Sequence, residues 1–67
     1  MKFKIKTNLI KQQMIAKDIT KEVLRKSCKI SAKQLYNLLD SSCYNKLMNI
    51  VKLSRFFKIN IYNLLKI

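Results

Sequence analysis

The side chains that could perform chemistry in this chain are few, and their types argue against catalysis. The 67 residues include no His, no Gly and only three acidic residues, Asp18, Glu22 and Asp40. An imidazole base is therefore absent, and so is a Gly-rich loop that could cradle phosphate groups. Two thiols, Cys28 and Cys43, fall short of the four ligands of a structural zinc site. We expect no enzyme activity, no metal and no cofactor.

A second set of polar residues, in the stretch KISAKQLYNLLD (residues 29–40), is suited to reading DNA bases. Lys33 can donate to guanine acceptors in the major groove, and Gln34 and Asn37 can each bind adenine with two hydrogen bonds. Ala32 would permit a close approach and could touch a thymine methyl group. These four residues are the predicted base contacts, provided that the stretch forms a helix.

The charge of the chain favours an anionic partner. Fifteen Lys and Arg against three Asp and Glu give a formal net charge of +12. A field of this size attracts polyanions, which leaves nucleic acid, an acidic membrane surface or an acidic protein as partners. A bias towards AT-rich codons would explain the abundance of Lys but not the scarcity of acidic residues.

Hydrophobic periodicity predicts the helices that must position these residues. Residues 1–6 alternate apolar and Lys, which is typical of a short strand or an extended arm, and such an arm could also reach along DNA. A first helix is expected over Asn8 to Lys17. A second should run from Lys21 to Cys28, with Thr20 as its N-cap and Cys28 facing the core.

The third predicted helix contains the candidate base contacts. Ser31 with Gln34 matches the capping box S-x-x-Q, and the helix should run from Ala32 to about Leu39. Gln34 would then be less free to read a base. The inward positions of this helix are Leu35, Leu38 and Leu39.

The remainder of the chain predicts a loop and two more helices. DSSCYNK (residues 40–46) has the composition of a loop, and a fourth helix should then end at Phe57 with Leu47 among its inward residues. Asn60 can cap a last short helix through Leu65. The expected fold is therefore all-α: a compact bundle of about five short helices with a helix-turn-helix, forming one domain over residues 1–67.

Two segments together resemble a known family. ITKEVLRKSCKISAKQLYNLL looks like the helix-turn-helix of the phage repressor/Cro (XRE-like) superfamily, and KLMNIVKLSRFFKINIYNLL is similar to the segment that closes that fold. The match extends without gaps from Ile19 to Leu65. It implies a repressor-like transcriptional regulator of a phage or mobile element that binds double-stranded DNA. The helix Ser31 to Leu39 would lie in the major groove.

The resemblance also implies roles for individual residues. Ile30 and Ser31 match the end of the turn and the cap of the recognition helix, and the four predicted base contacts match the positions that meet bases or nearby phosphates. The match implies phosphate or sugar contacts from Lys21, Tyr36 and Lys46, and Lys29 is a further predicted phosphate contact. The implied location is the cytoplasm, in association with the nucleoid.

Four positions depart from the family pattern. Arg25 replaces a small Ala where the two helices cross, so its stem must pack while its head reaches solvent. Lys29 replaces the turn Gly, which costs on the order of 1 kcal/mol in a left-handed conformation. Leu39 stands in place of a common Glu, and Gln13 falls at a usually apolar position. These changes leave open a repurposed member.

Other interpretations stay open. The third helix could be an ordinary surface helix, and the scaffold could be a protein-interaction module, either antitoxin-like or a partner of a regulator. A homodimer could form through the C-terminal apolar residues Ile61, Leu64, Leu65 and Ile67 or through the N-terminal strand. No membrane or small-molecule partner is expected, since the three caps break the chain too often for one long amphipathic helix.

Overall fold

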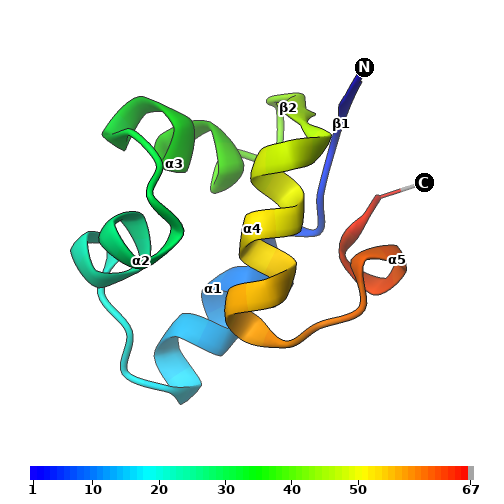
Figure 1. Ribbon diagram of the computed structural model, residues 1–67. Coiled ribbons are helices and arrows are strands. Elements are labelled where there is room, and N and C mark those ends of the chain that lie inside the picture. The colour runs from blue at the N-terminus through cyan, green and yellow to red at the C-terminus, as the bar shows by residue number, and fades with distance from the viewer. Residues whose placement is uncertain (67) are drawn as a thin grey trace.

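The computed structural model describes residues 1–66, so Ile67 of the predicted dimer surface lies outside the described residues. It confirms an all-α fold of five helices with a small sheet (Figure 1). The elements in chain order are β1 (Lys2–Phe3), α1 (Thr7–Ala16), α2 (Lys21–Cys28), α3 (Ala32–Leu38), β2 (Asn45–Lys46), α4 (Leu47–Phe57) and α5 (Ile61–Leu64). Over residues 1–66, no helix combines the length and hydropathy needed to cross a membrane.

The predicted N-caps are present at three helices. The Thr20 hydroxyl accepts a hydrogen bond from the backbone N–H of Val23 at 3.2 Å, and the Asn60 side chain accepts one from the N–H of Tyr62 at 2.9 Å. The capping box of α3 is complete: Ser31 Oγ accepts from the N–H of Gln34 at 3.1 Å, and Gln34 Oε1 accepts from the N–H of Ser31 at 2.9 Å. These bonds satisfy helix donors that would otherwise be unpaired.

Three non-Gly residues have a positive φ, and each follows a helix. They are Asp18 at 53°, Lys29 at 54° and Lys58 at 55°. Helices commonly end with a left-handed residue, usually Gly, because the reversal pairs the last free carbonyls. A chain without Gly must place a side chain at these points and bear the steric cost.

The N-terminal segment is part of the fold and not a free arm. β1 pairs antiparallel with β2, with Lys2 opposite Lys46. Ile5 forms an antiparallel bridge with Leu65. The backbone N–H of Lys6 donates to Leu64 at 2.8 Å, and that of Lys66 donates to Lys4 at 3.0 Å. Residues 45–46 form β2, so the prediction of a loop over residues 40–46 was wrong at its C-terminal end. A strand this short depends on its partner β1, which the local sequence does not indicate.

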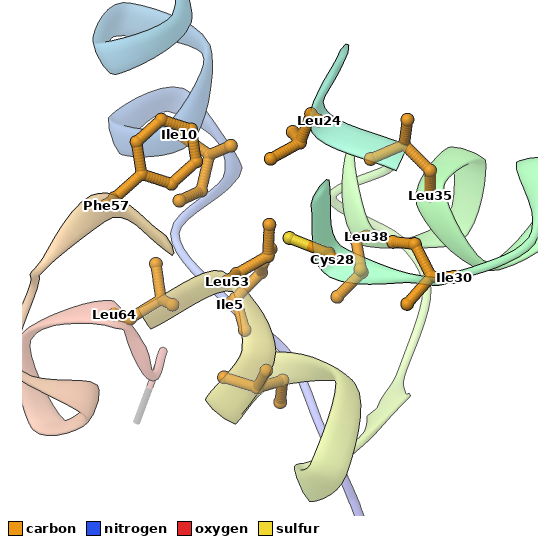
Figure 2. Close-up of a cluster of buried hydrophobic side chains, with 11 residues drawn as sticks. Ile5, Ile10, Leu24, Cys28, Ile30, Leu35, Leu38, Leu53, Phe57 and Leu64 are labelled. Carbon is orange, nitrogen blue, oxygen red and sulfur yellow. The ribbon is translucent and has the colours of Figure 1, made fainter. Parts of the chain in front are cut away.

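The core gathers around α4, which lies between the N-terminal helices and α5 in Figure 1. Figure 2 shows its side chains converging from all five helices and from the N-terminal segment. The buried apolar residues are Ile5, Ile10, Leu24, Cys28, Ile30, Leu35, Leu38, Ile50, Leu53, Phe57 and Leu64. Leu47 was predicted to face inward but is 43% exposed at the first position of α4. Leu39 is only half-buried.

Candidate nucleic-acid interface

The turn between α2 and α3 fixes where α3 begins. Lys29 ends α2 in the left-handed conformation, with φ 54° and ψ 49°. The next residue, Ile30, donates its N–H to the carbonyl of Arg25 at 3.2 Å and buries its side chain in the core. Ser31 then begins the capping box. A helix, a tight turn and a helix are thus held together by one buried side chain and two caps.

The first turn of α3 presents an exposed polar surface. Ala32, Lys33, Gln34 and Tyr36 are all exposed, while Leu35 is buried beneath them. The Oε1 atom of Gln34 is occupied by the capping box. A two-bond contact with adenine needs both an acceptor and a donor, so the capping bond at Oε1 competes with such a contact, whereas the amide N–H groups of Gln34 remain available to a base or phosphate.

Asn37 is less accessible than the other predicted base contacts. Its side chain is half-buried, and Oδ1 accepts a weak hydrogen bond from the Cys43 thiol at 3.8 Å. Its carbonyl oxygen accepts from the side-chain amide of Asn45 at 3.5 Å. Asn37 therefore joins α3 to the loop before β2, and Lys33 is more exposed than Asn37.

The predicted phosphate contacts fall into separate places. Lys21 and Tyr36 line one groove, together with Ala32. Lys29 is exposed in the turn before α3. Lys46 lies instead at β2, opposite Lys2, beyond the far end of α3. Two of the four thus share the groove beside α3, Lys29 lies in the turn before α3, and Lys46 lies at the β1–β2 sheet.

The groove has a volume of about 1050 Å³ and runs between α1, α2 and α3. Its apolar lining comes from Met14, Ile15, Ile19, Ala32, Leu35, Tyr36 and Leu39. All three acidic side chains of the chain line it, although they are distant in the sequence. Three cations, Lys11, Lys21 and Arg25, line it as well. We name this surface the α1–α3 groove.

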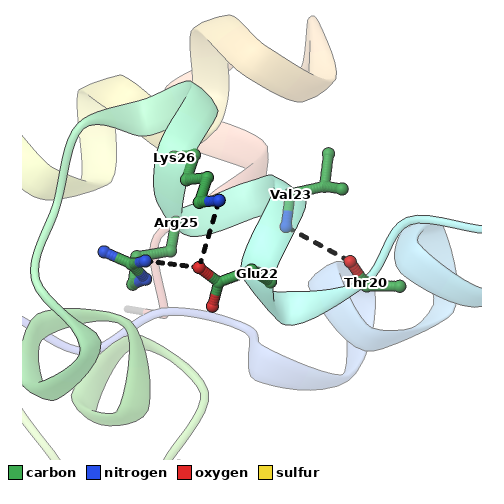
Figure 3. A network of polar contacts seen from close by, with 5 residues as sticks. All are labelled: Thr20, Glu22, Val23, Arg25 and Lys26. Atoms are coloured by element: carbon green, nitrogen blue, oxygen red, sulfur yellow. Dashed lines mark hydrogen bonds and ion pairs between the residues drawn. The ribbon is translucent and has the colours of Figure 1, made fainter.

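An ion-pair network occupies one wall of the α1–α3 groove (Figure 3). Glu22 accepts a charge-assisted hydrogen bond from Arg25, and its Oε1 lies 3.7 Å from Nζ of Lys26. The hydrogen bond from Arg25 lowers the pKa of the Glu22 carboxyl. The Arg25 side chain is 32% exposed. The charged end of Arg25 thus reaches solvent, as expected. Arg25, which stands where the family pattern has a small Ala, forms part of the groove wall.

The chain was compared with protein-family models, with curated proteins and with solved structures. No match was found in any of the three comparisons. The resemblance to the phage repressor/Cro superfamily stays a prediction, and the function must be argued from the residues and geometry of this chain.

A second group of cations was not singled out from the sequence. Lys29 lies beside Lys52 and Arg55 of α4 in a shallow cleft of about 430 Å³, which Ser27 and Phe56 also line. Lys52 and Arg55 are three residues apart, so they share one face of α4. The spacing of Lys52 and Arg55 is the only sequence signal for this cluster. Lys29 comes close to them only because α2 packs against α4.

Proposed function

We propose that the protein is a DNA-binding transcriptional regulator that places α3 in the major groove of double-stranded DNA. The observation that carries the proposal is the exposed first turn of α3, where Lys33 is free and Ala32 allows a close approach. The capping box and the buried Ile30 fix this turn relative to the rest of the fold. A preformed recognition surface loses little conformational entropy on binding.

The distribution of charge supports an approach by the N-terminal end of α3. Lys29 and Lys33 lie at this end, whereas Asp40 follows the C-terminal end. Glu22 is already paired with Arg25 and Lys26, which reduces its repulsion of phosphates. This polarity agrees with helix-turn-helix proteins in general, in which the N-terminal residues of the recognition helix contact the bases. The regulator would then act at the nucleoid, as a binding protein and not as an enzyme.

Selection of bound duplexes from a random library, followed by mobility-shift titration, tests the proposal. The Lys33→Ala variant should bind the selected site about 10- to 100-fold more weakly and tolerate more bases at one position. Lys66→Ala is the matched control, because it removes the same charge from the C-terminal segment, away from α3 in Figure 1. If roughly six phosphates are neutralised, log K should fall against log salt with a slope of about −5.

The outcome separates DNA binding from its main alternative. Equal losses for Lys33→Ala and Lys66→Ala would mean that only net charge matters, and the assignment of α3 would be wrong. If no duplex is selected, the alternative is a protein-interaction module, either antitoxin-like or a partner of a regulator. The apolar lining of the α1–α3 groove favours that alternative over an ordinary surface helix.

A further inference from the structure

The α1–α3 groove differs in charge from the rest of the molecule. It contains every acidic side chain of the chain together with three of the fifteen cations. The other twelve Lys and Arg side chains lie outside it, with no acidic side chain among them. The groove is therefore locally neutral, while the remaining surface carries a single sign of charge.

This distribution restricts how two copies of the chain can meet. A two-fold symmetric interface uses the same surface on both copies, so that surface must be complementary to itself. Because the charged side chains outside the groove are all cations, a pairing that leaves out the groove offers no opposite-charge contacts between side chains of the two copies. Within the groove, Asp18 and Asp40 of one copy can face Lys11 and Lys21 of the other, while Glu22 and Arg25 stay paired within each copy.

The lining of the groove includes both protruding and recessed apolar side chains. Two of its apolar lining residues protrude, since Ile15 is 81% exposed and Tyr36 is 71% exposed. Half-buried Met14, Ile19 and Leu39 lie lower in the lining. Apolar side chains that project beside an apolar hollow provide both halves of one interface, and their burial would supply the driving force.

Parts of the two surfaces first expected to dimerise already pair with each other within the chain. Ile5 of the N-terminal segment is buried and pairs with Leu65, and Leu64 is buried in the core. Their backbone groups bond each other across residues 4–6 and 64–66.

We propose that the α1–α3 groove is the site where a second copy of this chain docks, with Ile15 of each copy seated in the groove of the other. The docked copy covers Lys21, Ala32 and Tyr36. On the function proposed above, these residues belong to the DNA-binding face. Self-association and DNA binding therefore compete, and the dimer is the form that does not bind DNA.

Sedimentation velocity of the protein without DNA tests docking independently of the DNA proposal. Two copies that each carry +12 repel one another, and this repulsion is screened as the Debye length falls from about 10 Å at 0.1 M salt to about 3 Å at 1 M. The dimer should therefore strengthen with salt, which is opposite to the salt dependence of DNA binding. A monomer at both salt concentrations and at all protein concentrations overturns the proposal.

Substitutions identify the surface. Ile15→Lys should weaken the dimer on the order of a hundredfold, because two symmetry-related side chains lose their burial. Met48→Lys is the control: it adds the same charge at an apolar residue that is 66% exposed on α4, outside the groove. Thermal unfolding checks that both variants fold. A dimer that Ile15→Lys and Met48→Lys weaken equally is formed elsewhere, and docking in the groove is then wrong.

A variant that changes the charge of the groove distinguishes the docking proposal from the DNA-binding proposal. Asp18→Asn with Asp40→Asn removes two anions from the groove, so the dimer should weaken while DNA binding is kept or strengthened. If the wild type dimerises as described but no duplex is selected, the groove proposal holds and the DNA proposal fails. If DNA is bound but the dimer is insensitive to this variant and to Ile15→Lys, only the groove proposal fails.

Discussion

Lys29 and Lys58 end two different helices in nearly the same backbone conformation. The φ and ψ angles are 54° and 49° at Lys29, and 55° and 42° at Lys58. Each N–H donates to carbonyls in the last turn of its own helix. Both residues are Lys where Gly is the usual occupant. Both residues share the cost of this conformation, but only Lys29 lies beside α3. Comparing variants at the two positions therefore distinguishes the conformational cost from a role in DNA binding.

Replacing either Lys by Gly should stabilise the fold. Lys58→Gly and Lys29→Gly should each raise the free energy of unfolding by about 1 kcal/mol, because Gly relieves the contact between Cβ and the backbone. Urea denaturation measures this effect. Only Lys29→Gly should also weaken DNA binding, since Lys29 is the predicted phosphate contact. A loss of stability in both variants would show that the lysine stems contribute more through packing than the conformation costs.

The capping box of α3 should have a measurable effect on stability. Ser31→Ala removes the acceptor for the N–H of Gln34 and should lower the free energy of unfolding by about 1 kcal/mol. Ser27→Ala, at an exposed position inside α2, is a control that should change stability little. The backbone N–H at position 31 is kept in Ser31→Ala, so Gln34 Oε1 retains its donor and the selected DNA sequence should stay the same. A changed selected sequence would mean that the Ser31 hydroxyl also helps to position a base-contacting side chain of α3.

Stability should fall in acid because two carboxyls have lowered pKa values in the folded state. The Arg25 hydrogen bond lowers the pKa of Glu22, and hydrogen bonds from Ser42 lower that of Asp40. A carboxyl of this kind stabilises the fold fully above its ordinary pKa, and the contribution is lost as the pH falls through the lowered value. Thermal unfolding between pH 6 and pH 2 should show this loss, and Glu22→Gln with Asp40→Asn should flatten it. An unchanged profile in the double variant would show that these two carboxyls do not cause the acid sensitivity.

The two thiols should react at different rates in the folded protein. Cys28 is buried in the core, and this burial raises the pKa of its thiol, whereas Cys43 is half-buried beside Asn37. Alkylation under native conditions should modify Cys43 first, because the reactive form is the thiolate and it must be accessible. Mass spectrometry of peptides identifies the modified residue. If Cys28 and Cys43 are alkylated at equal rates both in the native protein and in urea, the α2–α4 contact that buries Cys28 opens readily.

Local signals predicted most of this fold, while the grouping of the acidic residues could not be predicted. Thr20, Ser31 and Asn60 act on N–H groups only two or three residues away, so the sequence near each one is sufficient to recognise it. Residues 18, 22 and 40 meet at one groove only because α1, α2 and α3 pack as they do. β2 was missed for the same reason, since a two-residue strand has no periodicity of its own and depends on its partner.

The N-terminal segment should behave as part of the core. Ile5 is 2% exposed and bridges Leu65, so Ile5→Ala should lower the free energy of unfolding by about 2 to 4 kcal/mol through lost burial and a residual cavity. Met48→Ala, at an exposed apolar residue, should change it by less than about 0.5 kcal/mol. Hydrogen exchange offers a second measurement, because the N–H groups of Lys6 and Lys66 are bonded between the two ends of the chain. Both should be protected, and both should lose protection together in Ile5→Ala. Rapid exchange at Lys6 in the wild type, with little effect of Ile5→Ala, would instead describe a mobile arm that could reach along DNA.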